Sequence, residues 1–296
     1  MLLSRQLASR LNTRLPALPL ACPHATPHRR FSAPAPSKPR TAIVTGGARG
    51  IGRAIALGLA RDGYDITVND VSSAQPLIDE TVAAIRALGR RAHGHAADVS
   101  SPDLAAGLVE SAVSALGPLD TMVANAGIAQ VKPLLEVTPE DFERMFAVNV
   151  AGVHYCYQAA ARQLIAQGTA GKLIGAASIV AFKPFALLGH YSASKWAVRG
   201  LTQAYAMELA EHGITANAYA PGIVDTPMWE LIDEGLAKKA GKAKGDMITK
   251  YSRELIALGR TSVPEDVAKL VGFLASPAAG YITGQTYIVD GGIIFT

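Results

Sequence analysis

The sequence predicts an α/β fold in which a doubly wound parallel sheet of about seven strands is flanked by helices. From Thr41 onward, short apolar runs alternate with longer amphipathic segments, which is typical of repeated strand-helix units. A glycine-rich turn follows the first apolar run directly, and no further domain boundary appears after residue 40. About 256 residues remain beyond that point, enough for one large domain with a substantial core.

The first forty residues differ in composition from the rest of the chain. They contain no acidic residue and seven basic ones: Arg5, Arg10, Arg14, Arg29, Arg30, Lys38 and Arg40. Leucines recur every four residues among these arginines, and Pro16 ends the amphipathic segment. Residues 1–40 therefore predict a mitochondrial transit peptide and a matrix location, with processing after Phe31. A disordered basic leader on a cytoplasmic protein is the alternative.

Most of the excess positive charge belongs to this leader. The whole chain has 28 basic and 24 acidic residues, a net charge of +4, whereas the part from Thr41 onward has a net charge of −3. Binding to nucleic acid is therefore not expected, and the leader lacks the long apolar core of a membrane anchor. Cys22 lies in the leader and Cys156 in the body, which predicts no intrachain disulfide and no cysteine-based metal site in the body.

Seven short apolar runs are predicted as strands: Ala42–Thr45, Asp65–Asn69, His93–Ala97, Thr121–Ala124, Leu173–Ala177, Thr215–Tyr219 and Thr286–Val289. The longer segments between them predict helices. One of these begins at Thr138, where an N-cap residue precedes Pro139 at the first helical position. The insertion at about 227–258 has Lys238, Lys239, Lys242 and Lys244 among glycine and alanine residues, and it predicts either a solvated helical hairpin or a lid over a substrate.

The glycine-rich turn TGGARGIG spans Thr45 to Gly52 and opens a helix. Glycines there let backbone amides approach a pyrophosphate at the positive end of the helix, as in a Rossmann-like nucleotide site. Asp70 ends the second strand, 24 residues after Gly46, where a carboxylate accepts hydrogen bonds from the adenosine ribose and repels a 2′-phosphate. The pattern predicts NAD as the cofactor rather than NADP. Arg49 is the opposing signal, because a basic residue in this turn can bind a 2′-phosphate.

The segment from Ser178 to Lys195 contains three groups suited to proton transfer. On a helix, Tyr191 and Lys195 share one face, with Cβ atoms roughly 5–6 Å apart. A cation at that place stabilises a phenolate and lowers the pKa of the phenol from about 10. Tyr191 is therefore a candidate general acid/base. Ser178 follows a predicted buried strand, so its hydroxyl is expected at the carboxyl end of the sheet, where it can hold a substrate carbonyl.

Seven motifs in order resemble those of the short-chain dehydrogenase/reductases. They are Thr45–Gly52, Asp98-Val99, Asn125-Ala126-Gly127, Asn149, Ser178, Tyr191 with Lys195, and Pro221-Gly222 followed by Val224 and Thr226. The resemblance covers the chain from about Thr41 to Thr296. Departures from residues common in the family occur at Ala124, Gly175 and Ala177, none of which is a catalytic position.

The resemblance implies an NAD(P)-dependent oxidoreductase that acts on CH–OH groups and forms a homotetramer or homodimer. The catalytic residues that it implies are Asn149, Ser178, Tyr191 and Lys195, with Ser178 and Tyr191 also binding the substrate. The cofactor-binding residues that it implies are Gly46, Arg49, Gly50, Ile51, Gly52, Asp70, Asp98, Val99, Asn125, Tyr191, Lys195, Val224 and Thr226. In this scheme Lys195 binds the nicotinamide ribose and lowers the pKa of Tyr191, while Asn149 holds a water that links Lys195 to solvent.

Three further segments look most like acetoin/diacetyl reductases and butanediol dehydrogenases, namely Asn217–Trp229, Ala240-Gly241-Lys242 and Asp290–Phe295. They imply a small vicinal diketone or hydroxyketone as the substrate. One wall of its pocket is expected from Ala181, Phe182, Phe185 and Leu187, and the other from Met228 and Trp229. A 3-oxoacyl-thioester reductase, a polyol dehydrogenase and a non-enzymatic scaffold subunit of the same fold are the alternatives.

Overall fold

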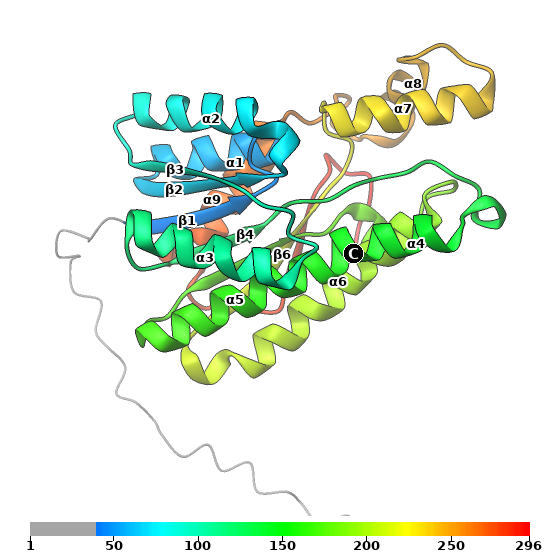
Figure 1. Cartoon of the computed structure of the whole chain (residues 1–296). Coiled ribbons are helices and arrows are strands. Elements are labelled where there is room, and N and C mark those ends of the chain that lie inside the picture. The colour runs from blue at the N-terminus through cyan, green and yellow to red at the C-terminus, as the bar shows by residue number, and fades with distance from the viewer. Residues whose placement is uncertain (1–39) are drawn as a thin grey trace, which may run out of the picture. The chain divides into compact units, whose positions relative to one another are not determined.

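A parallel sheet of seven strands lies at the centre of the computed structural model, which describes residues 40–296 (Figure 1). The strands are β1 (Arg40–Thr45), β2 (Tyr64–Asp70), β3 (Ala92–Ala96), β4 (Thr121–Ala124), β5 (Lys172–Ala176), β6 (Thr215–Pro221) and β7 (Thr286–Val289). Their order in the sheet is β3-β2-β1-β4-β5-β6-β7, and every neighbouring pair is parallel. All seven predicted strands are confirmed, with ends that differ by at most two residues.

Helices cover both faces of this sheet. They are α1 (Gly50–Arg61), α2 (Gln75–Ala87), α3 (Pro102–Leu116), α4 (Pro139–Phe146), α5 (Gly152–Gln167), α6 (Gly189–Glu208), α7 (Pro227–Ala240), α8 (Asp246–Leu255) and α9 (Pro264–Ala275). The short 3₁₀ turns are η1 (Ser72–Ala74), η2 (Leu134–Glu136), η4 (Ile179–Ala181), η5 (Ala210–His212) and η6 (Pro277–Ala279), and η3 (Ala147–Ala151) is a π-helix. The predicted leader lies outside the described residues, apart from Arg40.

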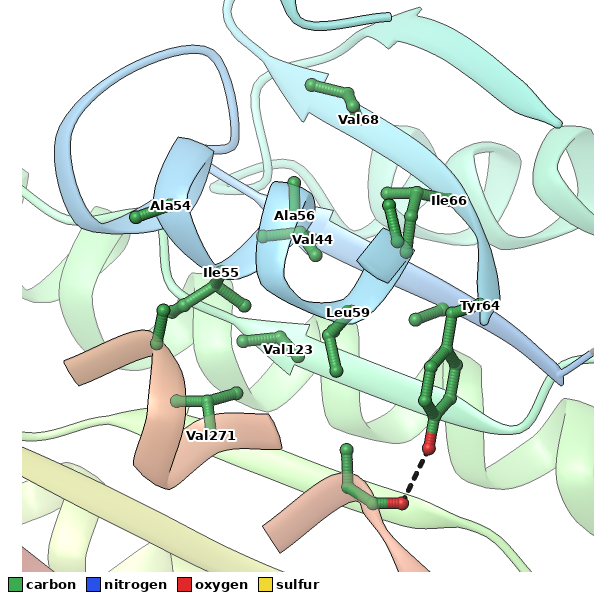
Figure 2. Close-up of a cluster of buried hydrophobic side chains, with 14 of the residues drawn as sticks. Val44, Ala54, Ile55, Ala56, Leu59, Tyr64, Ile66, Val68, Val123 and Val271 are labelled. Atoms are coloured by element: carbon green, nitrogen blue, oxygen red, sulfur yellow. Dashed lines mark hydrogen bonds between the residues drawn. The ribbon is translucent and has the colours of Figure 1, made fainter. Parts of the chain in front are cut away.

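Each face of the sheet has its own apolar core. Helices α1, α2 and α9 cover one face, and α3, α5 and α6 cover the other (Figure 1). On the first face, Ile55 and Leu59 of α1 lie between Val123 of the sheet and Val271 of α9 (Figure 2). Burying each such side chain stabilises the fold by about 1.5–3 kcal/mol. The two cores make the sheet a rigid support for the loops at its carboxyl end.

The junction between β1 and β4 is the point at which the strand order reverses. The chain builds outward from β1 to β2 and β3, then returns to place β4, β5, β6 and β7 on the other side. In open α/β sheets, ligands bind at the carboxyl ends of the strands beside such a reversal. The sheet therefore positions the loops that follow β1 and β4 side by side at a binding site.

The N-terminus of α4 confirms the cap predicted at Thr138. The Thr138 hydroxyl accepts a hydrogen bond from the Asp141 amide at 3.2 Å, and the Asp141 carboxylate accepts one from the Thr138 amide at 3.2 Å. Pro139 occupies the first helical position, where no amide hydrogen is needed. This reciprocal cap fixes the start of α4 beside the loop that follows β4.

The insertion at 227–258 forms a helical hairpin of α7 and α8 (Figure 1). The buried Asp233 carboxylate on α7 accepts hydrogen bonds from the amides of Gly245 and, at 2.7 Å, Ile248, which begin α8. Lys239 pairs with Glu136 of η2 at 3.4 Å and ties the hairpin to the loop after β4. The predicted hairpin is confirmed, and its action as a lid stays a prediction.

Candidate active site

A cleft with a volume of about 880 Å³ lies at the carboxyl end of the sheet. Nearly every site residue predicted from the sequence lines it: Gly46, Arg49, Gly50, Ile51, Gly52, Asp70, Asp98, Val99, Asn125, Ser178, Tyr191, Lys195, Val224 and Thr226. Asn149 is the exception. Residues from six separate loops thus meet in one cavity large enough for a dinucleotide and a small substrate.

The glycine turn adopts a conformation that requires glycine. Gly46 and Gly50 have φ angles of +60° and +53°, in the left-handed region. A Cβ atom at Gly52 would collide with the carbonyl oxygen of Gly46. The turn leads into α1, whose N-cap residue, Arg49, makes no side-chain hydrogen bond to the amides of the first turn. These amides at the positive end of the helix fit the pyrophosphate of a dinucleotide.

Asp70 lies at the end of β2 beside this turn. Its carboxylate accepts hydrogen bonds from the Val71 amide at 2.9 Å and from the Ala48 amide at 3.3 Å, which holds it at the rim of the cleft. Arg49 is exposed and lines the same part of the cleft. Asp70 and Arg49, which predict opposite cofactor preferences, therefore both line the cleft.

Asn125 occupies the centre of the cleft wall, but its amide binds protein. Its Nδ2 donates to the carbonyl oxygens of Thr45 and Gly46 at 2.9 and 3.1 Å, and its Oδ1 accepts from the Tyr219 hydroxyl at 2.7 Å. Both amide hydrogens are therefore used. Asn125 fixes the glycine turn against β4 and β6, and its predicted role in cofactor binding stays a prediction.

Ser178, Tyr191 and Lys195 come together as the sequence predicts. Ser178 directly follows Ala177 at the end of β5 and caps η4 by accepting a hydrogen bond from the Val180 amide at 3.3 Å. Tyr191 and Lys195 lie one turn apart near the start of α6, and Lys195 Nζ is 5.6 Å from the centre of the Tyr191 ring. All three side chains are buried.

Burial decides the acid-base properties of this group. Desolvation raises the pKa of Tyr191 to about 12, and the Ser178 hydroxyl opposes that rise. Desolvation also lowers the pKa of Lys195 to about 8. Removal from water penalises the charged form of each group, and the role of Lys195 in lowering the pKa of Tyr191 stays a prediction.

Asn149 lies behind the cleft rather than in it. It belongs to the π-helix η3, a kind of turn found at functional sites, and it is fully buried. Its Oδ1 accepts from the Ile128 amide at 2.8 Å, and its Nδ2 donates to the Ile128 carbonyl and to the Ser194 hydroxyl, each at 3.0 Å. Asn149 thus holds the loop after β4 against α6, and its predicted catalytic role stays a prediction.

Gly127 allows Asn149 to approach the catalytic lysine. A Cβ atom on Gly127 would lie 3.2 Å from Asn149 Oδ1 and 3.4 Å from Lys195 Nζ. A side chain there would crowd both polar atoms. The glycine of the Asn125-Ala126-Gly127 motif thus has a physical function, because it leaves room for the two groups on either side of the same backbone position.

The substrate walls predicted from the sequence are partly wrong. Phe185, Met228 and Trp229 line the cleft, but Ala181, Phe182 and Leu187 do not. Ala181 is fully buried beneath it, and the Phe182 ring lies against the Arg199 guanidinium, 4.2 Å from ring centre to Cζ. A 3₁₀ turn follows Ser178, so the side chains after it do not alternate as they would in an extended loop.

Several residues of the cleft were not predicted. They include Ile128, Gln130, Asp141, Arg144, Ile179, Val180, Lys183, Leu188, Ile293 and Ile294. The last two return to the cleft because Gly291 and Gly292 have positive φ angles and Asp290 accepts hydrogen bonds from the Gly292 and Ile294 amides. The two consecutive glycines were the sequence signal for this reversal.

Neither a membrane-spanning helix nor a metal cluster is found between residues 40 and 296. No helix of that part of the chain is long and apolar enough to cross a bilayer. Within the same residues, no three His, Cys, Asp or Glu side chains are grouped to hold a metal ion.

The sheet, the glycine turn and the Ser178, Tyr191 and Lys195 group define a dinucleotide-binding oxidoreductase. The family described as enoyl-(acyl carrier protein) reductase matches residues 46–294. A short-chain dehydrogenase/reductase from Armillaria gallica is 44% identical over 259 residues, which is 88% of this chain and 97% of that protein. The chain belongs to the short-chain dehydrogenase/reductase family, whose members use nicotinamide cofactors.

Other relatives carry more specific names. The L-2,3-butanediol dehydrogenase of Corynebacterium glutamicum is 50% identical, covering 86% of this chain and 99% of that protein. A diacetyl reductase [(S)-acetoin forming] of Staphylococcus epidermidis is 44% identical, with coverage of 86% and 99%. The crystal structure of an acetoin dehydrogenase from Salmonella typhimurium has a TM-score of 0.76 and 35% identity, covering 86% of this chain and 96% of that one.

Proposed function

We propose that the protein interconverts a small vicinal diketone or hydroxyketone with the corresponding secondary alcohol, of the diacetyl, acetoin and butanediol type. The observation that carries the proposal is the apolar surroundings of Tyr191. This residue belongs to a cluster with Val180, Leu188 and Ile232, against which Phe185 and Trp229 are packed. Such walls leave the hydroxyls of a polyol unpaired, at a cost of about 1–3 kcal/mol for each buried group. The names of the relatives support the same substrate class.

In this proposal the chain supplies proton transfer and orientation. A nicotinamide cofactor, when bound, supplies or accepts the hydride. Tyr191 donates its phenolic proton to the substrate oxygen during reduction and takes it back during oxidation. Ser178 donates a hydrogen bond to the same oxygen. Lys195 lies one helical turn from Tyr191, where its ammonium stabilises the phenolate that forms in the reduction.

We infer that NAD(H) is preferred over NADP(H). The support is the Asp70 carboxylate, which two backbone amides hold at the rim of the cleft. A 2′-phosphate placed beside it meets a like charge, which costs several kcal/mol in a partly buried site. Arg49 offsets part of that cost, because its guanidinium lies at the same end of the cleft.

The proposal extends to location and assembly. Residues 1–40 have the composition of a mitochondrial transit peptide, so we propose the matrix as the site of action. N-terminal sequencing of protein from the native cell is expected to begin near Ser32, and an intact Met1 on cytoplasmic protein would contradict the proposal.

A homotetramer or homodimer is supported by the exposed Trp196 and Met207 on α6, which are 46% and 81% exposed in the single chain.

The deciding experiment is NADH oxidation measured with a panel of carbonyl substrates. We expect a higher kcat/KM for diacetyl and acetoin than for fructose or an acetoacetyl thioester, and a higher kcat/KM for 2,3-butanediol than for xylitol in the oxidative direction. Efficient turnover of the acetoacetyl thioester would instead support the 3-oxoacyl reductase alternative. Efficient turnover of fructose or xylitol would support the polyol dehydrogenase alternative. The absence of turnover with every substrate would support the scaffold alternative.

A further inference from the structure

Gln130 is a polar residue in the wall of the cleft whose side chain is held from two sides. Its Nε2 donates to Asp141 Oδ1 at 2.7 Å, and its Oε1 is 2.9 Å from Nε2 of His190. Asp141 also pairs with Lys132 Nζ at 2.5 Å. His190 is 1% exposed and directly precedes Tyr191. Gln130 therefore contacts His190, whose neighbour in the sequence, Tyr191, is the proposed proton donor.

The chemistry of these groups fixes which way the Gln130 amide points. The Asp141 carboxylate only accepts hydrogen bonds, because Lys132 holds its pKa well below the usual range. Gln130 must therefore present its NH₂ group to Asp141 and its oxygen to His190. His190 in turn must carry its hydrogen on Nε2, and burial lowers its pKa, which favours the neutral ring. A flipped amide would oppose oxygen to oxygen at Asp141.

This arrangement leaves Gln130 with one hydrogen to offer. Its Nε2 carries two hydrogens, and across residues 40–296 the structure gives it one acceptor, Asp141. Three other neutral polar side chains of the cleft have their donors engaged. Asn125 and Tyr219 bind each other, and Thr226 accepts from the Trp229 amide while donating to the Val224 carbonyl. Gln130 therefore adds a free hydrogen-bond donor to a cleft whose lining includes the apolar cluster around Tyr191.

We propose that Gln130 binds the second oxygen of a vicinal substrate through this Nε2 hydrogen, while Ser178 and Tyr191 bind the reacting oxygen. The inference rests on the proposed function, which it makes more specific. Gln130 becomes a specificity-determining residue, and His190 and Asp141 are positioning residues that keep its donor turned toward the cleft. Because the group only donates, it favours a carbonyl or hydroxyl oxygen next to the reacting carbon over a methylene group at the same place.

The test compares diacetyl with 2-butanone, which lacks the second oxygen. Gln130→Met keeps the length of the side chain and removes its amide. We expect kcat/KM for diacetyl to fall about tenfold, mainly through KM, while kcat/KM for 2-butanone changes by less than about twofold. Gln130→Leu is the second variant if the first folds poorly, and the NADH Kd and Tm are measured for both.

Two outcomes would overturn the inference alone. A variant that retains the wild-type preference for diacetyl shows that Gln130 does not contact the second oxygen. An equal loss on both ketones shows a general structural role. A wild-type enzyme that does not prefer diacetyl over 2-butanone would overturn the proposed function itself, together with the inference that rests on it.

The positioning role of His190 has its own measurement. His190→Phe keeps a ring at the same place but cannot donate to Gln130 Oε1, so the amide is free to turn. The ratio of kcat/KM for diacetyl to that for 2-butanone is expected to fall about threefold, with kcat for 2-butanone retained. An unchanged ratio in folded protein would show that His190 does not orient Gln130.

Discussion

Lys195 Nζ donates a hydrogen bond to the carbonyl oxygen of Ala176 at 2.8 Å, so the buried ammonium of α6 is tied to the end of β5. Burial lowers the pKa of this lysine from its ordinary value of 10.5 to about 8. At neutral pH, a shift of this size corresponds to a cost of about 3 kcal/mol for keeping the side chain charged in the folded protein. The buried Lys195 side chain therefore lowers the stability of the folded protein.

Lys195→Met is expected to stabilise the protein and to abolish turnover. The unfolded chain takes up the lysine proton as the pH falls below about 10.4, and the folded chain does so only below about 8, so the wild type loses stability across that interval. Relative to wild type, the variant should gain a few degrees of Tm at pH 7, and the gain should shrink as the pH rises from 8 to 10. A lower Tm than wild type at pH 7 would contradict this.

Tyr191→Phe should remove turnover while leaving NADH binding intact, because only the phenolic hydroxyl is lost. We expect less than a few per cent of wild-type kcat with diacetyl. Titration of NADH fluorescence should give a Kd within about threefold of wild type. Activity well above that level would mean that the proton comes from another group. Tyr251→Phe, on α8, is the control for removal of a hydroxyl near the cleft.

Asp70→Ser should reduce the preference for NADH over NADPH. The carboxylate would face a 2′-phosphate of like charge, and its removal is expected to raise kcat/KM with NADPH at least tenfold. Arg49→Ala is the matched variant on the same rim of the cleft, and it should lower NADPH use instead. Equal kcat/KM values for the two cofactors in the wild type would show that Asp70 does not discriminate.

Asp233→Ala should loosen the hairpin of α7 and α8. Its buried carboxylate accepts the amides of Gly245 and Ile248, and removal of a charged cap costs about 1–3 kcal/mol. We expect a raised KM for diacetyl, an unchanged NADH Kd and faster proteolysis between residues 240 and 250. Asp246→Ala removes an exposed carboxylate from the same hairpin and serves as the control. Equal effects of the two variants would speak against a specific role for Asp233.

We expect His93 and His95 to make the folded protein less stable at acid pH. His93 Nε2 and His95 Nδ1 share the Ser111 hydroxyl at 2.8 and 3.1 Å, and burial lowers the pKa of both rings. As the pH falls below about 6.5, the unfolded chain takes up protons before the folded chain does, so folding becomes less favourable.

Replacing both of these histidines with glutamine should make the fall in Tm between pH 6.5 and 5 shallower. The slope is not expected to vanish, because burial also lowers the pKa of His190. His212→Gln, at an exposed position in η5, is the control and should leave the slope unchanged. A double variant with the wild-type slope would show that the pair does not titrate on unfolding.

The sequence predicted most accurately the features that depend on neighbouring residues. The glycine turn follows its strand within a few residues, and the four-residue spacing of Tyr191 and Lys195 fixes their shared face once α6 forms. The placement of Asn149 was not predictable in this way. Asn149 lies in the π-helix η3, and its side chain meets Ile128 and Ser194, which are distant from it in the sequence.

Contacts between distant parts of the chain also escaped prediction. Ile293 and Ile294 line the cleft although they follow Tyr191 by about one hundred residues. No local sequence pattern predicts that this C-terminal segment lies at the cleft. Gln130 was overlooked because its significance depends on His190, sixty positions away. The proximity of such residues depends on the folded sheet, which places their loops side by side.

The π-helix η3 between α4 and α5 makes the spacing of this region intolerant of deletion. A π-turn closes i→i+5 hydrogen bonds in place of i→i+4, so removing one residue from 147–151 would convert it to an ordinary α-helical turn. Asn149 would then lose the backbone position from which it meets both Ile128 and Ser194. Variation in length is therefore expected to be confined to other segments, such as the tip of the α7–α8 hairpin, where the chain is exposed.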